Sequence, residues 1–102
     1  MKYSELDFKG GIVTFDSYKN YPEAEYFTDS TLSQDMLMIN YGNYTIDLGW
    51  YGLKYMIAII NNNCEEWIPF YSIKVLSHEE VFDKLQEVIN LAPKYYKLMV
   101  FS

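Results

Sequence analysis

The sequence predicts an α+β fold: a mainly antiparallel, twisted sheet of five to six strands with one amphipathic helix packed on one face. Three observations predict it. Strand-like segments flank Gly42-Asn43, a residue pair typical of tight hairpin turns. Residues 55–60 form an unbroken apolar strand, and residues 77–92 carry a helical apolar stripe. At 102 residues the chain is long enough for one domain and too short for two, so residues 1–102 are predicted to form a single domain.

The first strand is expected at residues 12–16, a β-branched run that follows Gly10-Gly11. The residues from 18 to 34 have no strand or helix periodicity, and they contain Pro22 and a polar cluster. We therefore expect a long loop there, with one helical turn at most.

The next two strands, residues 36–41 and 44–51, should form a hairpin. Alternation in the second strand divides its residues between two faces. One face carries Tyr44, Ile46, Leu48 and Trp50, and the other carries Thr45, Asp47, Gly49 and Tyr51. This pattern predicts a half-buried strand. Residues 54–60 should form the next strand, and because residues 55–60 are apolar on both faces we expect it to be the central strand.

The last third of the chain contains an edge segment and the helix. Pro69 lacks an N–H donor, so residues 67–71 should form an edge strand or an irregular segment. Residues 77–80, Ser-His-Glu-Glu, have a capping-box pattern. Pro93 is predicted to end the helix, and residues 95–101 to form a last strand or a packed extension. The apolar stripe of the helix consists of Val81, Phe82, Leu85, Val88, Ile89 and Ala92.

Charge indicates the kind of partner. The sequence contains fourteen carboxylates, eight lysines and no arginine, and its formal net charge is −6. Phosphate neutralisation supplies most nucleic-acid affinity, so this balance argues against nucleic-acid binding. It also disfavours an acidic membrane surface. A basic macromolecule is the expected partner.

The sequence also predicts a cytoplasmic location. Cys64 is the only cysteine, so an internal disulfide is impossible. Residues 1–7 lack the apolar segment of a signal peptide, and no apolar run approaches the roughly 20 residues of a membrane span.

Catalytic patterns are scarce, and we expect a protein that is not an enzyme and uses no cofactor and no metal. His78 is the only histidine, and it lies among carboxylates at the start of the helix. Cys64 precedes Glu65 and Glu66 and lacks the cationic neighbours that activate a thiol. Neither zinc nor calcium spacing nor a phosphate-binding glycine loop occurs. A small enzyme or ligand-binding domain built around His78 or Cys64 remains an alternative.

Carboxylates and aromatic residues are the candidate partner-binding groups, because desolvated acids and aromatic anchors dominate many interfaces. We expect the strand residues Thr14, Asp16, Thr45, Asp47 and Tyr51 to come together on the face opposite the core. The predicted partner-binding residues are Asp16, Asp29, Asp35, Asp47, Tyr51, Glu65, Glu66 and Trp67.

Residues 44–91 resemble small bacterial immunity proteins, the antitoxins encoded beside polymorphic and contact-dependent growth inhibition toxins. The resemblance lies in Ile46-Asp47-Leu48-Gly49-Trp50-Tyr51, an apolar strand, Glu66-Trp67-Ile68-Pro69, and Ser77-x-x-Glu80 opening one helix. It implies a cytosolic protein that binds a toxin domain, in many cases a basic nuclease, in a 1:1 complex and blocks its active site. It transfers no interface residues. The alternative is another acidic protein-binding inhibitor, such as a nucleic-acid mimic.

Overall fold

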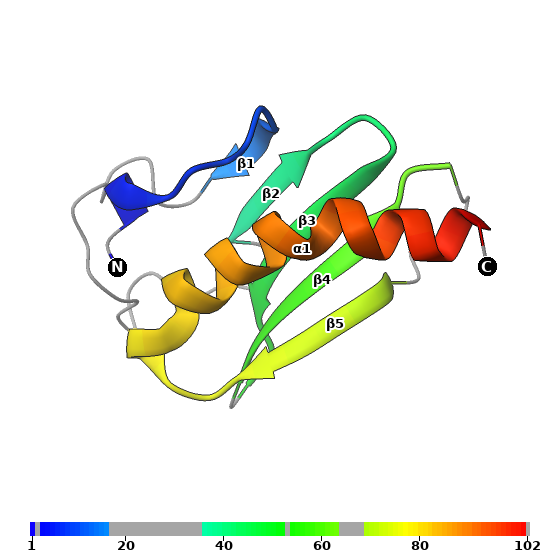
Figure 1. Ribbon diagram of the computed structural model, residues 1–102. Helices are drawn as coiled ribbons and strands as arrows, with labels where there is room; N and C mark the ends of the chain where they lie inside the picture. Colours follow the sequence, from blue (N-terminus) through cyan, green and yellow to red (C-terminus); the bar gives the residue numbers. More distant parts are fainter. Residues whose placement is uncertain (2, 17–35, 53, 64–68, 102) are drawn as a thin grey trace.

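The computed structural model describes residues 1, 3–16, 36–52, 54–63 and 69–101, and over these residues it is an α+β fold (Figure 1). Five strands of the described chain form one antiparallel sheet in the order β1-β2-β3-β4-β5. Each strand therefore pairs with its sequence neighbours, which makes the sheet a meander. In chain order the elements are η1 (Tyr3–Glu5), β1 (Ile12–Asp16), β2 (Leu37–Asn40), β3 (Tyr44–Trp50), β4 (Tyr55–Asn61), β5 (Pro69–Val75), η3 (His78–Glu80) and α1 (Val81–Phe101).

Helix α1 lies across one face of the sheet, which we call the inner face, and the opposite face is the outer face (Figure 1). Between α1 and the sheet lies the core, built from alternate residues of the strands and from the predicted helical stripe. Its largest fully buried side chains include Tyr55 and Phe82. On β3 the core contains Tyr44, Ile46 and Leu48, the face predicted from alternation.

The β2–β3 hairpin turns at Gly42-Asn43, as predicted. The Tyr41 N–H donates to the Tyr44 carbonyl over 2.9 Å, which closes a two-residue loop. Gly42 has φ +90°, a value that glycine adopts without the steric cost of a Cβ. The Asn62 amide from the end of β4 also donates to the Gly42 carbonyl over 3.0 Å, so a third strand fixes this turn.

Strands β4 and β5 differ in part from prediction. Strand β4 is buried on both faces as expected, but β3 is the middle strand and β4 lies next to it. Strand β5 lies at the sheet edge, as Pro69 predicted, and it extends to Val75. Pro69 at the first position of β5 removes no hydrogen bond from the interior of the sheet.

The helix begins differently from the capping-box prediction. Ser77 has extended backbone geometry, but its side chain makes no capping hydrogen bond. Instead, the Glu80 N–H donates to the Ser77 carbonyl over 3.2 Å, and one 3-10 turn leads into α1. A tighter first turn thus satisfies a backbone donor that the box would have left to a side chain.

The prediction that Pro93 ends the helix is wrong, and of the two alternatives for residues 95–101 the structure shows a packed helical extension and not a strand. Helix α1 continues through Pro93 to Phe101. An interior proline costs about 3 kcal/mol, and the aromatic residues that follow it supply compensating contacts. Tyr95 stacks on Tyr71 with ring centroids 4.4 Å apart, and Tyr96 packs against Tyr44 at 5.5 Å. The final helical turns are therefore held by the sheet.

Candidate partner-binding face

Two of the middle positions on the outer face are occupied by small residues. Register pairs Asp47 with Ala58 and Gly49 with Met56, and all four residues are on the outer face. Gly49 has no side chain and Ala58 has only a methyl group. Interior strand positions of this size often mark a place where another backbone or a ligand approaches closely.

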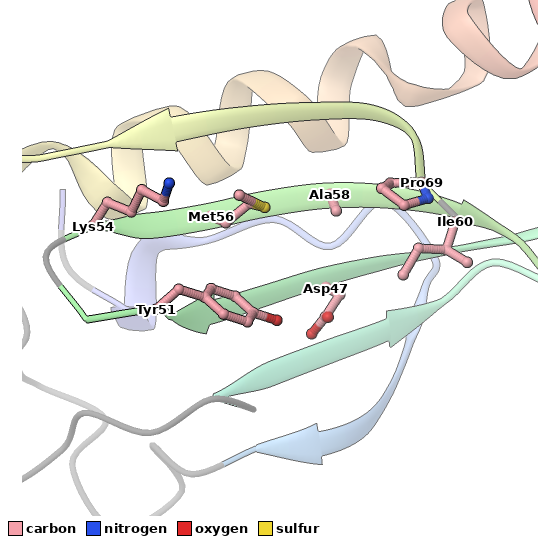
Figure 2. Close-up of a pocket in the computed structure, with 7 residues that line it drawn as sticks. All are labelled: Asp47, Tyr51, Lys54, Met56, Ala58, Ile60 and Pro69. Atoms are coloured by element: carbon pink, nitrogen blue, oxygen red, sulfur yellow. The ribbon is translucent and has the colours of Figure 1, made fainter. Parts of the chain in front are cut away.

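A hollow of about 420 Å³ lies on the outer face, and we call it the Asp47 hollow (Figure 2). Figure 2 shows the Tyr51 side chain directed along the sheet toward Asp47, with Met56 and Ala58 on the neighbouring strand. The hollow thus has a carboxylate, a phenol and an ammonium around an apolar floor. Its lining residues are Asp47, Tyr51, Lys54, Met56, Ala58, Ile60 and Pro69.

Burial of the outer side of β3 is greater than predicted. Thr45 and Asp47 are each only 6% exposed, so the half-buried strand is a wrong prediction. Position contributes to this burial, because β3 is the middle strand and Met38 of β2 and Ala58 of β4 lie on either side of Asp47. Tyr51, just past the end of β3, is 42% exposed. The hollow therefore combines a shielded acid with an accessible aromatic ring.

Hydrogen bonds close the outer face at its hairpin end. The Thr45 hydroxyl donates to Asn62 Oδ1 over 2.7 Å, and Asn62 Nδ2 donates to Asn40 Oδ1 over 3.2 Å. The Gly42 N–H donates to the same Asn40 oxygen over 2.7 Å. These polar groups are partnered within the sheet, so we assign this end a structural role.

A bulge in β1 separates Asp16 from the hollow. The register shifts between Val13 and Phe15, so that Phe15 pairs with Met38 and Asp16 pairs with Leu37 of the core. Asp16 thereby lies on the inner side, where it accepts a hydrogen bond from the Tyr3 hydroxyl. The predicted meeting of Asp16 with Asp47 is wrong, because the extra residue of a bulge reverses the alternation beyond it.

Of the predicted partner-binding residues, the structure brings Asp47 and Tyr51 together and places Asp16 elsewhere. Asp29, Asp35, Glu65, Glu66 and Trp67 lie outside the described residues. Sequence reasoning missed the β4 side of the hollow. The signal was available, because a tight turn at Gly52 places Lys54 opposite Tyr51 and carries the pairing on to Ala58 and Asp47.

The two candidate catalytic residues come from different parts of the chain. Cys64 lies outside the described residues, and the backbone of His78 forms part of the 3-10 turn before α1. Within the same residues, no group of three or more His, Cys, Asp or Glu side chains could hold a metal ion.

A scan against protein-family models and searches of curated proteins and of solved structures found no match to this chain. The resemblance to immunity proteins therefore stays a prediction. Among the described helices, none is long and apolar enough to cross a membrane. The functional argument rests on the geometry and charge of the outer face.

Proposed function

We propose that this protein is a cytoplasmic immunity protein of a contact-dependent growth inhibition or related toxin system. It binds a basic toxin domain, most simply a nuclease, through its outer face in a 1:1 complex, and it has no catalytic activity or cofactor of its own. The observation that carries the proposal is the Asp47 hollow, an acid and an aromatic ring beside an apolar floor on a domain of net charge −6.

The physical argument concerns where the acid lies. Asp47 is 6% exposed, and its interaction with a cation is screened by water much less than that of a surface acid. Tyr51 offers ring area and a hydroxyl at the rim, a combination enriched at interfaces. The negative field of the whole domain accelerates encounter with a cationic surface.

A nucleic-acid mimic is the second candidate, and the described carboxylates favour it less. A mimic needs acids spaced like phosphates along one face. Among the described strand residues, Asp47 is the only carboxylate on the outer face. On the helix, Asp83 lies 3.5 Å from the N-terminal amine and Glu87 lies 3.3 Å from Lys84, so part of that charge is compensated within the chain.

The decisive experiment begins with the adjacent open reading frame. Its product should carry a C-terminal toxin domain, which we expect to bind this chain with nanomolar affinity or tighter. Asp47→Asn, a nearly isosteric change, should raise the dissociation constant by about tenfold or more. Glu87→Gln on the exposed helix surface is the matched charge control and should leave affinity within about twofold.

Salt dependence tests the electrostatic part separately. The association rate should fall steeply between low and physiological ionic strength, because exposed charges are screened beyond about 8–10 Å. A neighbouring gene that encodes no toxin, or a purified protein that turns over a substrate alone, would contradict the proposed function.

A further inference from the structure

We propose that the Asp47 hollow binds the side chain of a single lysine from the partner protein. This inference rests on the proposed function, since it names the group by which the basic partner is held. Three features of the hollow carry it: the gap beside Ala58, the apolar floor, and opposite charges at separate positions along the strands.

The gap is suited to an unbranched chain. Ala58 contributes only a methyl group to the lining of the hollow, so part of the space that a larger side chain would fill there stays open. Met56, Ala58 and Ile60 follow one another on the same side of β4 and supply apolar contacts. A lysine stem of four methylene groups packs against such a surface while its ammonium reaches a polar group beyond it.

The charges select the orientation. Lys54 lies opposite Tyr51, whereas Asp47 is four positions earlier on β3, opposite Ala58. A cation entering the hollow is repelled at the Lys54 position and attracted at Asp47. A charge-assisted hydrogen bond from an ammonium to a carboxylate is stronger than a hydrogen bond between two neutral groups.

Lysine fits this acceptor better than arginine. Because Asp47 is only 6% exposed, little of its carboxylate is open to a donor from outside the chain. The guanidinium fork of arginine is planar and binds a carboxylate best through both oxygens at once. The compact ammonium of lysine can bind a single carboxylate oxygen from one direction.

The test uses the full chain and a defined probe, Nα-acetyl-L-lysine N-methylamide, in an NMR titration of isotope-labelled protein. We expect saturable shifts at the Gly49 amide and the Met56 and Ala58 methyl groups, with a dissociation constant on the order of millimolar for so small a ligand. The norleucine analogue has a comparable apolar chain without the ammonium, and it should bind about tenfold more weakly. The arginine analogue should also bind more weakly than the lysine probe.

Variants make the assignment specific. Asp47→Asn should weaken the lysine probe by about tenfold, and Ala58→Leu should abolish binding by filling the hollow. Lys54→Gln should tighten binding by about twofold to threefold, because it removes a like charge. Glu87→Gln should change nothing. Unchanged shifts for core methyl groups would verify that each variant is folded.

Two results would overturn the inference: equal affinity for the lysine and norleucine probes, or no saturable shift at Gly49 and Met56. Neutralisation assays separate it from the proposed function. If Ala58→Leu and Asp47→Asn proteins neutralise the cognate toxin as well as the parent does, the lysine site is wrong and the immunity function stands. If the lysine probe binds as described and no toxin does, the immunity function is wrong.

Discussion

The inner and outer faces of the sheet are built from the same strands and differ in how they are filled. On the inner face, Ile57, Ile59 and Leu48 are completely buried against the helix. On the outer face, the intervening Ala58 lines a hollow that also contains the Asp47 carboxylate. Alternation lets one backbone present two different surfaces: the inner face supplies most of the apolar burial that stabilises the fold, and the outer face is the one that we propose for recognition.

The largest expected effect contrasts adjacent residues of β4. Ile57→Ala should lower the free energy of unfolding by about 2–5 kcal/mol, because it opens a cavity between Leu48, Ile73 and the helix. Met56→Ala on the outer face should cost about 1 kcal/mol or less, since Met56 is only partly buried. Urea unfolding measures both. Equal losses would show that the outer face contributes to the core.

Adding volume should sharpen the same contrast. Ala92, a residue of α1, is completely buried, so Ala92→Leu should cost about 1–3 kcal/mol through overpacking. Ala58 is 7% exposed but lines the hollow, so the added side chain of Ala58→Leu can extend into it and should cost less stability than Ala92→Leu does. Thermal unfolding of the two variants is the measurement. A strongly destabilised Ala58→Leu protein would mean that the hollow is not available space.

The third prediction concerns the helical turns after Pro93. Tyr96→Ala removes the contacts with Tyr44 and Phe70 and should cost about 1–2 kcal/mol. Amide exchange in residues 94–98 should accelerate, because the proline leaves these turns dependent on the sheet. Lys97→Ala, at an exposed position, is the control. If amide exchange in residues 94–98 is unchanged in Tyr96→Ala, the helix continues past Pro93 because of its local helix propensity and not because of contacts with the sheet.

Alkaline pH should destabilise the inner face through its tyrosines. Burial, followed by the nearby Tyr44 and Asp7, raises the pKa of Tyr41 well above its ordinary value of 10.0. Above pH 10.0 the folded state keeps the Tyr41 proton while the unfolded state releases it. The contribution of Tyr41 to the free energy of unfolding is therefore fully present below pH 10.0 and is lost as pH rises further.

Tyr41→Phe tests this linkage. The free energy of unfolding of this variant should be about 0.5–1.5 kcal/mol lower at neutral pH, because the Tyr41 hydroxyl donates to the Phe8 carbonyl over 2.7 Å in the parent. Its stability should then decline less steeply above pH 10, as measured by urea unfolding across that range. The slope should not vanish, because burial also raises the pKa of Tyr44 and Tyr71. Identical slopes would exclude Tyr41 as a contributor.

The smallest effect is expected at the start of the helix. Ser77→Ala should change the free energy of unfolding by less than about 0.5 kcal/mol, below the usual cost of about 1 kcal/mol for removing an N-cap. The Ser77 side chain makes no capping hydrogen bond, and the backbone bond from Glu80 is unaffected. A loss of about 1 kcal/mol in Ser77→Ala would mean that the Ser77 hydroxyl makes a capping hydrogen bond to the helix in solution.

Local signals were sufficient for much of the fold. The turn at Gly42, the alternation in β3 and the apolar stripe of α1 each follow from neighbours in sequence, and the structure confirms all three. The helix end at Pro93 was mispredicted, because Tyr71 and Tyr44, which hold Tyr95 and Tyr96, come from distant strands. Asp16 was misplaced because nothing in the run 12–16 announces a bulge.

By itself, the sequence determined that this chain is an α+β meander with one helix, an acidic surface and a candidate pair in Asp47 and Tyr51. Only the tertiary structure decided that Asp47 is shielded, that Asp16 faces the other way, and that Ala58 and Met56 complete a hollow. Periodicity along one strand fixes which residues share a face. Depth and neighbours across strands depend on the position of each strand within the sheet, which is a property of the whole chain.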